Sequence, residues 1–115
     1  VMQGLLTRFD DIDAVFGAND PMALGAQLAA KQLGRDGIII TGVDGAPDTE
    51  DSLATEGSMI KASASQDPYT MAGQALELGY KLFNGETLDE TTVLIEPKLI
   101  TAENLDDYQG WTAKR

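Results

Sequence analysis

Short apolar runs alternate with longer stretches of helical periodicity along this chain. The runs typical of strands span residues 12–17, 38–43 and 59–65, and the stretches typical of helices span residues 21–33, 47–55 and 69–83. Residues 1–8 resemble the end of a helix whose beginning is missing. This alternation predicts a three-layer α/β fold, a parallel sheet flanked by helices, because consecutive parallel strands need a crossover helix between them.

Each predicted element has apolar positions that we expect to face a core. The unbroken run Ile38–Ile40 predicts a strand covered on both faces. Residues 92–100 form a last extended run, and Pro97, which cannot donate to a ladder, predicts an edge strand or a crossing segment there. The expected inward positions of the helices are Met22, Leu24, Ala26, Leu28, Ala29, Ala30, Leu33, Leu53, Ala54, Met71, Ala72, Ala75, Leu76, Leu78, Leu82 and Phe83.

Composition narrows the possible classes of function. The 115 residues, 43% of them hydrophobic, suffice for one compact core. A net charge of -11 disfavours direct binding to nucleic acid or to an anionic lipid surface. The chain has no Cys and no His, which removes disulfides, thiolate nucleophiles and His-activated serines. No apolar run approaches the roughly 20 residues of a membrane-spanning helix, and we expect any export signal to lie outside these residues.

The same order of polar residues follows the first and the third predicted strands. Residues 19–21 read Asn-Asp-Pro and residues 66–68 read Gln-Asp-Pro. Asp is favoured at the N-cap of a helix and Pro at its first position, so we expect an Asp to cap each helix. The second strand ends at residues 44–45 in Asp-Gly, which places a carboxylate at the equivalent point.

Asn19, Asp44 and Gln66 are therefore the candidate ligand-binding residues. Open α/β sheets bind ligands beyond the carboxyl ends of their strands, where all three residues are expected to lie. The two amides both donate and accept, and an ionised carboxylate accepts at two oxygens, which together suit a neutral polyol such as a sugar. Each residue also has a plain structural explanation, since Asn19 suits a helix cap, Asp44 suits a turn before Gly45, and Gln66 has the weakest individual case.

Four segments of the chain resemble the ribose-binding-protein group of periplasmic binding proteins. They are residues 12–26 (IDAVFGANDPMALGA), 42–48 (GVDGAPD), 63–69 (SASQDPY) and 99–104 (LITAEN). In that group the Asn of the Asn-Asp pair, the Asp of the Gly-Val-Asp-Gly turn and the Gln before the third helix bind sugar hydroxyls. The resemblance thus implies ligand-binding roles for Asn19, Asp44 and Gln66.

The resemblance implies that residues 1–115 are the C-terminal part of a two-lobed binding protein, contributing one incomplete lobe. A hinge-crossing segment is expected near residues 92–104. Residues 106–111 are expected to pack against the other lobe, with Trp111 as a C-terminal anchor rather than a sugar-stacking residue. An incomplete lobe exposes sheet edges, so the fragment is expected to pair with another chain or with the missing N-terminal portion.

The implied function is the substrate-binding component of an ABC-type sugar importer. Such a receptor closes on a sugar by a hinge and delivers it to membrane permease subunits. It works in the periplasm, or lipid-anchored outside a Gram-positive cell. The resemblance leaves the ligand open among pentoses, hexoses and cyclic polyols.

Other classes of function fit less well. The same fold serves as the effector-binding domain of lac-repressor-like transcription regulators, which remains the alternative. We expect no enzyme, since no nucleotide-binding glycine fingerprint is present and Ser63 and Ser65 have no His to activate them. A receiver-type phosphoacceptor role for Asp44 would need acidic residues at the carboxyl end of the first strand, whereas Asp10, Asp11 and Asp13 lie at the opposite end of that strand. We expect no cofactor and no metal, because the acidic runs suit solvated faces and helix starts.

Overall fold

The computed structural model describes residues 1–114 and divides the chain into two compact units. Unit 1 contains Val1–Gln66 and the residues from Lys98 onward, and unit 2 contains Asp67–Pro97. Unit 2 is therefore one continuous stretch of chain that leaves unit 1 after one strand and returns just before another.

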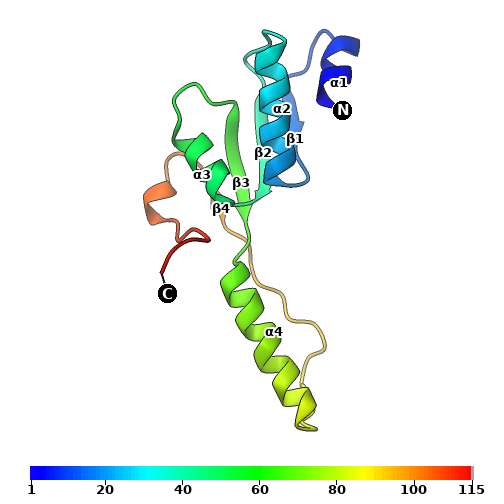
Figure 1. The fold of residues 1–115 in the computed structure, drawn as a ribbon, viewed down its shortest axis with the longest axis vertical. Helices are drawn as coiled ribbons and strands as arrows, with labels where there is room; N and C mark the ends of the chain where they lie inside the picture. The colour runs from blue at the N-terminus through cyan, green and yellow to red at the C-terminus, as the bar shows by residue number, and fades with distance from the viewer. Residues whose placement is uncertain (115) are drawn as a thin grey trace. The chain divides into compact units, whose positions relative to one another are not determined.

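Unit 1 is an α/β unit in which strands and helices alternate along the chain (Figure 1). Its elements are α1 (Met2–Arg8), β1 (Ala14–Phe16), α2 (Asp20–Gln32), β2 (Ile39–Asp44), α3 (Pro47–Ala54), β3 (Ile60–Ser65), β4 (Leu99–Ile100) and the 3-10 turn η1 (Leu105–Asp107). The predicted order of strands and helices is confirmed, with boundaries that differ by one or two residues.

The four strands form one sheet in the order β1-β2-β3-β4. β1, β2 and β3 are parallel to their neighbours, whereas β4 is antiparallel to β3, with Ile100 opposite Ser63 and Leu99 opposite Ala64. β4 is thus an edge strand, as Pro97 predicts, although residues 92–98 form no strand. The predicted class, an α/β sheet flanked by helices, is confirmed.

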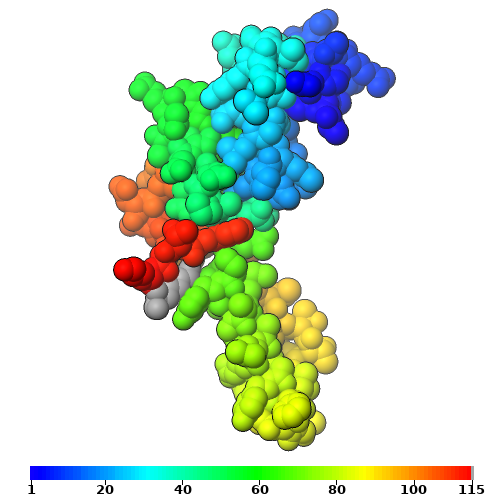
Figure 2. All heavy atoms as spheres, in the orientation of Figure 1, coloured from blue at the N-terminus to red at the C-terminus, as the bar shows by residue number. Residues whose placement is uncertain are grey.

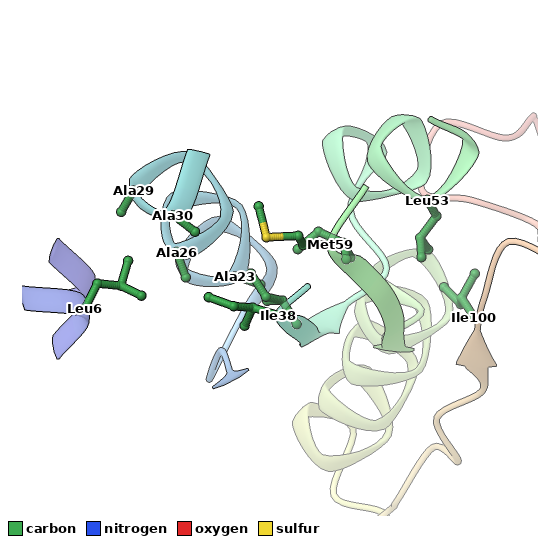
Figure 3. Close-up of a cluster of buried hydrophobic side chains, with 11 residues drawn as sticks. Leu6, Ala23, Ala26, Ala29, Ala30, Ile38, Leu53, Met59 and Ile100 are labelled. Atoms are coloured by element: carbon green, nitrogen blue, oxygen red, sulfur yellow. The ribbon is translucent and has the colours of Figure 1, made fainter. Parts of the chain in front are cut away.

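The core of unit 1 lies between one face of the sheet and the helices α2 and α3 (Figure 3). Leu53 of α3 faces Ile100 of β4, and Leu6 of α1 packs beside α2. Helix α2 contributes small side chains to this core, and its buried apolar residues are Ala23, Ala26, Ala29 and Ala30. Among the inward positions predicted for the first two helices, the exposed ones are Met22, Leu28, Leu33 and Ala54.

Two glycines explain why alanines, and not the larger residues of α2, face the sheet. A Cβ on Gly17 would lie 2.7 Å from the backbone nitrogen of Ala23, and a Cβ on Gly42 would collide with Asp20. The helix therefore packs directly on the strand backbone, where only a methyl side chain fits. Larger apolar residues are displaced to the flanks of the helix.

The opposite face of the sheet is exposed in unit 1. Phe16 is 70% exposed and Ile39 is 52% exposed, and both lie on the face away from the buried Ile40. The prediction that the second strand is covered on both faces is therefore wrong for the described residues. The β-branched residues of this strand favour burial, but they do not identify the chain segment that would cover its second face.

Unit 2 contains the helix α4 (Pro68–Phe83), which has no buried residue. The predicted inward positions are exposed, apart from the half-buried Leu78, with Leu76 at 76% and Phe83 at 88%. The reason is that residues 67–97 contain no second helix or strand for α4 to pack against. Among residues 1–114, no helix has the length and apolar character needed to cross a membrane.

Candidate functional site

The three candidate residues lie at the same end of the sheet, at the carboxyl ends of its parallel strands. Asn19 follows β1, Asp44 ends β2 and Gln66 follows β3, and these strands are parallel. Gln66 donates from Nε2 to Oδ1 of Asp44 at 2.7 Å. Asp44 Oδ2 lies 3.4 Å from the backbone nitrogen of Asp20, the residue next to Asn19. The structure therefore joins Asp44 and Gln66 directly and places the start of α2 beside them.

Asp44 has a strained backbone. Its φ of 130° is the only positive φ among the described residues other than glycine, and Gly45 follows with a φ of 68°. A non-glycine residue in such a conformation costs on the order of 1–3 kcal/mol, and it persists only where its surroundings fix it. Gly45 is also required by space, because a Cβ there would lie 2.5 Å from the Tyr108 hydroxyl.

Two buried side chains hold this turn from inside the protein. Asp20 and Ser63 are both fully buried. Ser63 Oγ donates to Asp20 Oδ1 at 2.7 Å and accepts from the Gly45 backbone nitrogen at 3.1 Å. Asp20 Oδ2 accepts from the Ala46 nitrogen at 2.8 Å. The carboxylate of Asp20 thus links the start of α2, the turn after β2 and the strand β3.

Two aromatic side chains hold the same turn from the C-terminal segment (red in Figure 2). Tyr108 donates its hydroxyl to the Gly45 carbonyl at 2.9 Å. Trp111 donates its indole N–H to the carbonyls of Asp44 at 3.1 Å and of Gln66 at 3.2 Å. Residues 106–111 thus lie on the strand ends of their own unit, and the expectation that this segment also packs against another lobe stays a prediction.

Asn19 caps helix α2. Its Oδ1 accepts from the backbone nitrogen of Met22 at 2.9 Å, which satisfies one of the free donors of the first turn. The expectation that Asp20 caps this helix is wrong, because Asp20 is the first helical residue and its carboxylate is bound inside the sheet. The Nδ2 donors of Asn19 remain available to a ligand, as does the second lone pair of its Oδ1.

Asp67 caps helix α4 as predicted. Its Oδ1 accepts from the Thr70 nitrogen at 3.0 Å, and its Oδ2 accepts from the Thr70 hydroxyl at 2.7 Å. With the carboxylate used for the cap, the exposed side chain of the preceding Gln66 is left to reach Asp44. The Gln66 backbone nitrogen also donates to the Asp44 carbonyl at 2.8 Å, so both residues are fixed by main-chain contact.

Glu50 of α3 is the acidic group with a perturbed pKa near this turn. Burial, and then the neighbouring Asp51 carboxylate, raise the pKa of Glu50. A Cβ on the buried Gly110 would lie 2.8 Å from Glu50 Oε2, so the C-terminal segment packs directly over this carboxylate. Among the described residues no group of three or more acidic side chains is placed to hold a metal ion.

Sequence reasoning identified Asn19, Asp44 and Gln66 and missed the residues that hold them. The position of Asp20 next to Asn19 indicated a role at the site, but the same position also suited a helix cap. Trp111 was expected as a C-terminal anchor, but nothing in the sequence indicated its contact with Asp44 and Gln66, and Ser63 and Tyr108 carried no signal that separates them from ordinary strand or C-terminal residues. The site therefore offers a ligand one carboxylate and one carboxamide. These two groups are held side by side at the solvent-accessible carboxyl ends of β2 and β3.

The chain matches a known protein family and is similar in sequence to several import binding proteins. Residues 1–87 match the family model described as a periplasmic binding protein domain. The chain is 38% identical to the ribose import binding protein of Salmonella typhimurium over 86 residues, which is 75% of this chain and 28% of that protein. It is 36% identical to the D-apiose import binding protein of Actinobacillus succinogenes over 104 residues, which is 90% of this chain and 33% of that protein.

A solved structure shows the same fold. It is an ABC transporter solute binding protein from Agrobacterium vitis with bound allitol, with a TM-score of 0.83 and 27% identity, covering 92% of this chain and 37% of that chain. The chain therefore spans about a third of the length of the proteins it matches.

Proposed function

This chain belongs to the periplasmic binding protein family, and from that premise we propose that it forms part of the substrate-binding component of an ABC-type sugar importer. In this proposal residues 1–115 are the C-terminal part of a two-lobed protein. The ligand is a monosaccharide or related polyol, and Asn19, Asp44 and Gln66 bind its hydroxyl groups.

The observation that carries the proposal is the Asp44–Gln66 pair. The two side chains hydrogen-bond each other at 2.7 Å while Gln66 is exposed, so a ligand can reach them without unfolding the sheet edge. A sugar hydroxyl donates to a carboxylate and accepts from an amide, so one hydroxyl can satisfy both groups. Hydrogen bonds to an ionised carboxylate are short and about twice as strong as neutral ones, which favours polyol binding at this point.

The names of the matched proteins support the class of ligand. They are import binding proteins for ribose and for D-apiose, and a solute binding protein with allitol bound. These names favour a transport role over the effector domain of a transcription regulator. They are also names of binding proteins rather than enzymes, which supports a non-catalytic role for this chain.

The proposed mechanism is closure of two lobes around the ligand. A ligand shifts the equilibrium toward the closed state only as far as it binds that state more tightly. The hinge crossing expected near residues 92–104 remains part of this proposal. The closed form would be recognised by membrane permease subunits, in the periplasm or at the outer surface of a Gram-positive cell.

A thermal-shift screen tests the proposed function. The whole protein that contains these residues is heated with ribose, D-apiose, allitol and further pentoses and hexoses. A specific ligand raises the midpoint by several degrees, since ligand at about 100 times its Kd adds roughly 2.7 kcal/mol. The variant Asp44→Asn should lose the shift. Asp36→Asn, the same change at an exposed position before the other end of β2, should keep it.

Three outcomes of this screen distinguish a sugar receptor that uses Asp44 from the alternatives. A shift lost only in Asp44→Asn supports a sugar receptor with Asp44 in its site. A shift unaffected by Asp44→Asn removes Asp44 from the site. The absence of any shift in the unsubstituted protein contradicts the function proposed.

A further inference from the structure

The turn at residues 44–46 is bound at almost every backbone polar group. The Gly45 and Ala46 nitrogens donate to Ser63 and Asp20, which are buried within the sheet and the start of α2. The Asp44 carbonyl accepts from the Gln66 nitrogen and from Trp111, and the Gly45 carbonyl accepts from Tyr108. The strained φ of Asp44 is thus held from two sides, by the interior and by the C-terminal segment.

The two sides differ in what they hold. The buried side chains of Ser63 and Asp20 bind the nitrogens of Gly45 and Ala46. The indole of Trp111 instead lies between the carbonyls of Asp44 and Gln66, at 3.1 and 3.2 Å. One N–H therefore links the backbones of the two residues whose side chains meet at 2.7 Å. This link adds to the main-chain hydrogen bond of 2.8 Å from the Gln66 nitrogen to the Asp44 carbonyl, so two contacts set the separation of the two backbones.

The C-terminal segment is itself tied to unit 1 at several points. Asn104 accepts from the Thr101 nitrogen at 2.8 Å and donates to the Leu99 carbonyl at 2.9 Å, which fixes the chain as it leaves β4. Leu105 and Tyr108 pack against the core, and the buried Gly110 lies on Glu50. Trp111 is 39% exposed, so its contact with the turn is at the solvent edge and not part of the core.

We propose that Tyr108 and Trp111 are positioning residues of the ligand site, which hold the strained Asp44–Gly45 turn so that Asp44 and Gln66 meet the ligand together. The proposal rests on the sugar-binding function proposed above. Neither aromatic residue needs to touch the ligand. Loss of either donor lets the Asp44 backbone relax, and the affinity falls because binding must then restore the strained conformation.

Two conservative variants test this positioning role in the whole protein. Trp111→Phe and Tyr108→Phe remove one donor each and keep an aromatic ring. Tyr80→Phe, at a 67% exposed tyrosine in α4, is the matched control. Calorimetry with whichever of ribose, D-apiose or allitol binds should show a roughly five- to tenfold rise in Kd for Trp111→Phe and a smaller rise for Tyr108→Phe. Tyr80→Phe should leave Kd unchanged.

A double-mutant cycle separates positioning from general stability. If Trp111 acts by orienting Gln66, then Trp111→Phe should raise Kd less in a Gln66→Ala background, where no side chain remains to be oriented. A purely structural role gives the same fold-change in both backgrounds. The positioning role is overturned by equal fold-changes, or by an unchanged Kd in Trp111→Phe.

Hydrogen exchange gives a readout that needs no ligand. The amides of Gly45 and Gln66 should exchange faster in Trp111→Phe and Tyr108→Phe than in Tyr80→Phe, since exchange reports local opening. If no sugar binds the unsubstituted protein, the proposed function fails, while faster exchange still supports a turn held by the C-terminal segment. Unchanged exchange at both amides contradicts the positioning role, whether or not a sugar binds.

Discussion

At the start of α2 the sequence Asn-Asp-Pro turns the chain from a strand into a helix, and at the start of α4 the sequence Gln-Asp-Pro does the same. At α2 the amide caps the helix and the carboxylate of Asp20 is buried in the sheet. At α4 the carboxylate of Asp67 caps the helix and the amide of Gln66 reaches Asp44. The roles of amide and carboxylate are exchanged.

The difference comes from what each Asp meets. Asp20 lies above Gly42, where the missing Cβ leaves room for a carboxylate, and it finds donors on Ser63 and Ala46. Asp67 begins a helix that has no buried residue, so its nearest donors are those of its own first turn. One local sequence therefore has two uses, and the depth of the surrounding packing decides between them.

The largest difference between the two junctions should appear on removing each carboxylate. Asp20→Ala leaves the Ser63 hydroxyl and the Ala46 N–H without their acceptor in a buried place. We expect a loss of roughly 3 kcal/mol in the free energy of unfolding, because hydrogen bonds to buried charged groups are among the strongest. Denaturant unfolding of the whole protein measures it, and a loss below about 1 kcal/mol would contradict the buried role.

At Asn19 the cap and the proposed ligand contact can be separated. Asn19→Asp keeps an oxygen for the Met22 nitrogen, so stability should hardly change. The same variant loses the Nδ2 donors, so the affinity for a sugar should fall about tenfold. Asn19→Ala should lose both the stability that the helix cap provides and the affinity for a sugar. If Asn19→Asp binds sugar as the unsubstituted protein does, Asn19 is a cap only.

Removing the carboxylate at α4 should have a smaller and more local effect. Asp67→Ala deletes the acceptor for Thr70 and should cost about 1 kcal/mol, as is usual for an N-cap. Asp67→Asn serves as the control, because Asn caps nearly as well. Faster hydrogen exchange confined to the first turn of α4 is the expected signature. A loss as large as that of Asp20→Ala would show that the two junctions are alike.

The smallest effect is expected from Glu50, which lies under the C-terminal segment. Because burial raises the pKa of Glu50 in the folded state, the folded chain binds this proton more tightly than the unfolded chain. The ionised carboxylate therefore lowers stability above the folded-state pKa, and this penalty disappears as the pH falls below the unfolded-state pKa.

Glu50→Gln should raise the melting midpoint by roughly a degree near pH 7 and leave it unchanged near pH 3. Glu56→Gln, at an exposed residue just after α3, is the control. A midpoint that falls at neutral pH in Glu50→Gln would mean that the charged carboxylate stabilises the fold.

The sequence predicts much of this fold because its signals are local. Helical periodicity, Pro at the helix starts and β-branched runs place each element up to α4 within one or two residues, whereas the last extended run, 92–100, shortens to β4 at Leu99–Ile100. Parallel strands then bring residues 19, 44 and 66 to one edge. The burial of Asp20 and the contact of Trp111 with Asp44 join residues far apart in sequence, so no local pattern reveals them. The apolar residues of α4 predict a helix face without identifying what covers it.

In the function proposed above, Asp44 and Gln66 bind one sugar together. A crystal structure of the whole protein with ribose or another polyol bound tests it most directly. Hydroxyl oxygens of the ligand should lie within ~3 Å of the Asp44 carboxylate and the Gln66 amide, with the Trp111 indole still on both carbonyls. A ligand that lies elsewhere, with the Asp44–Gln66 hydrogen bond intact, would contradict it.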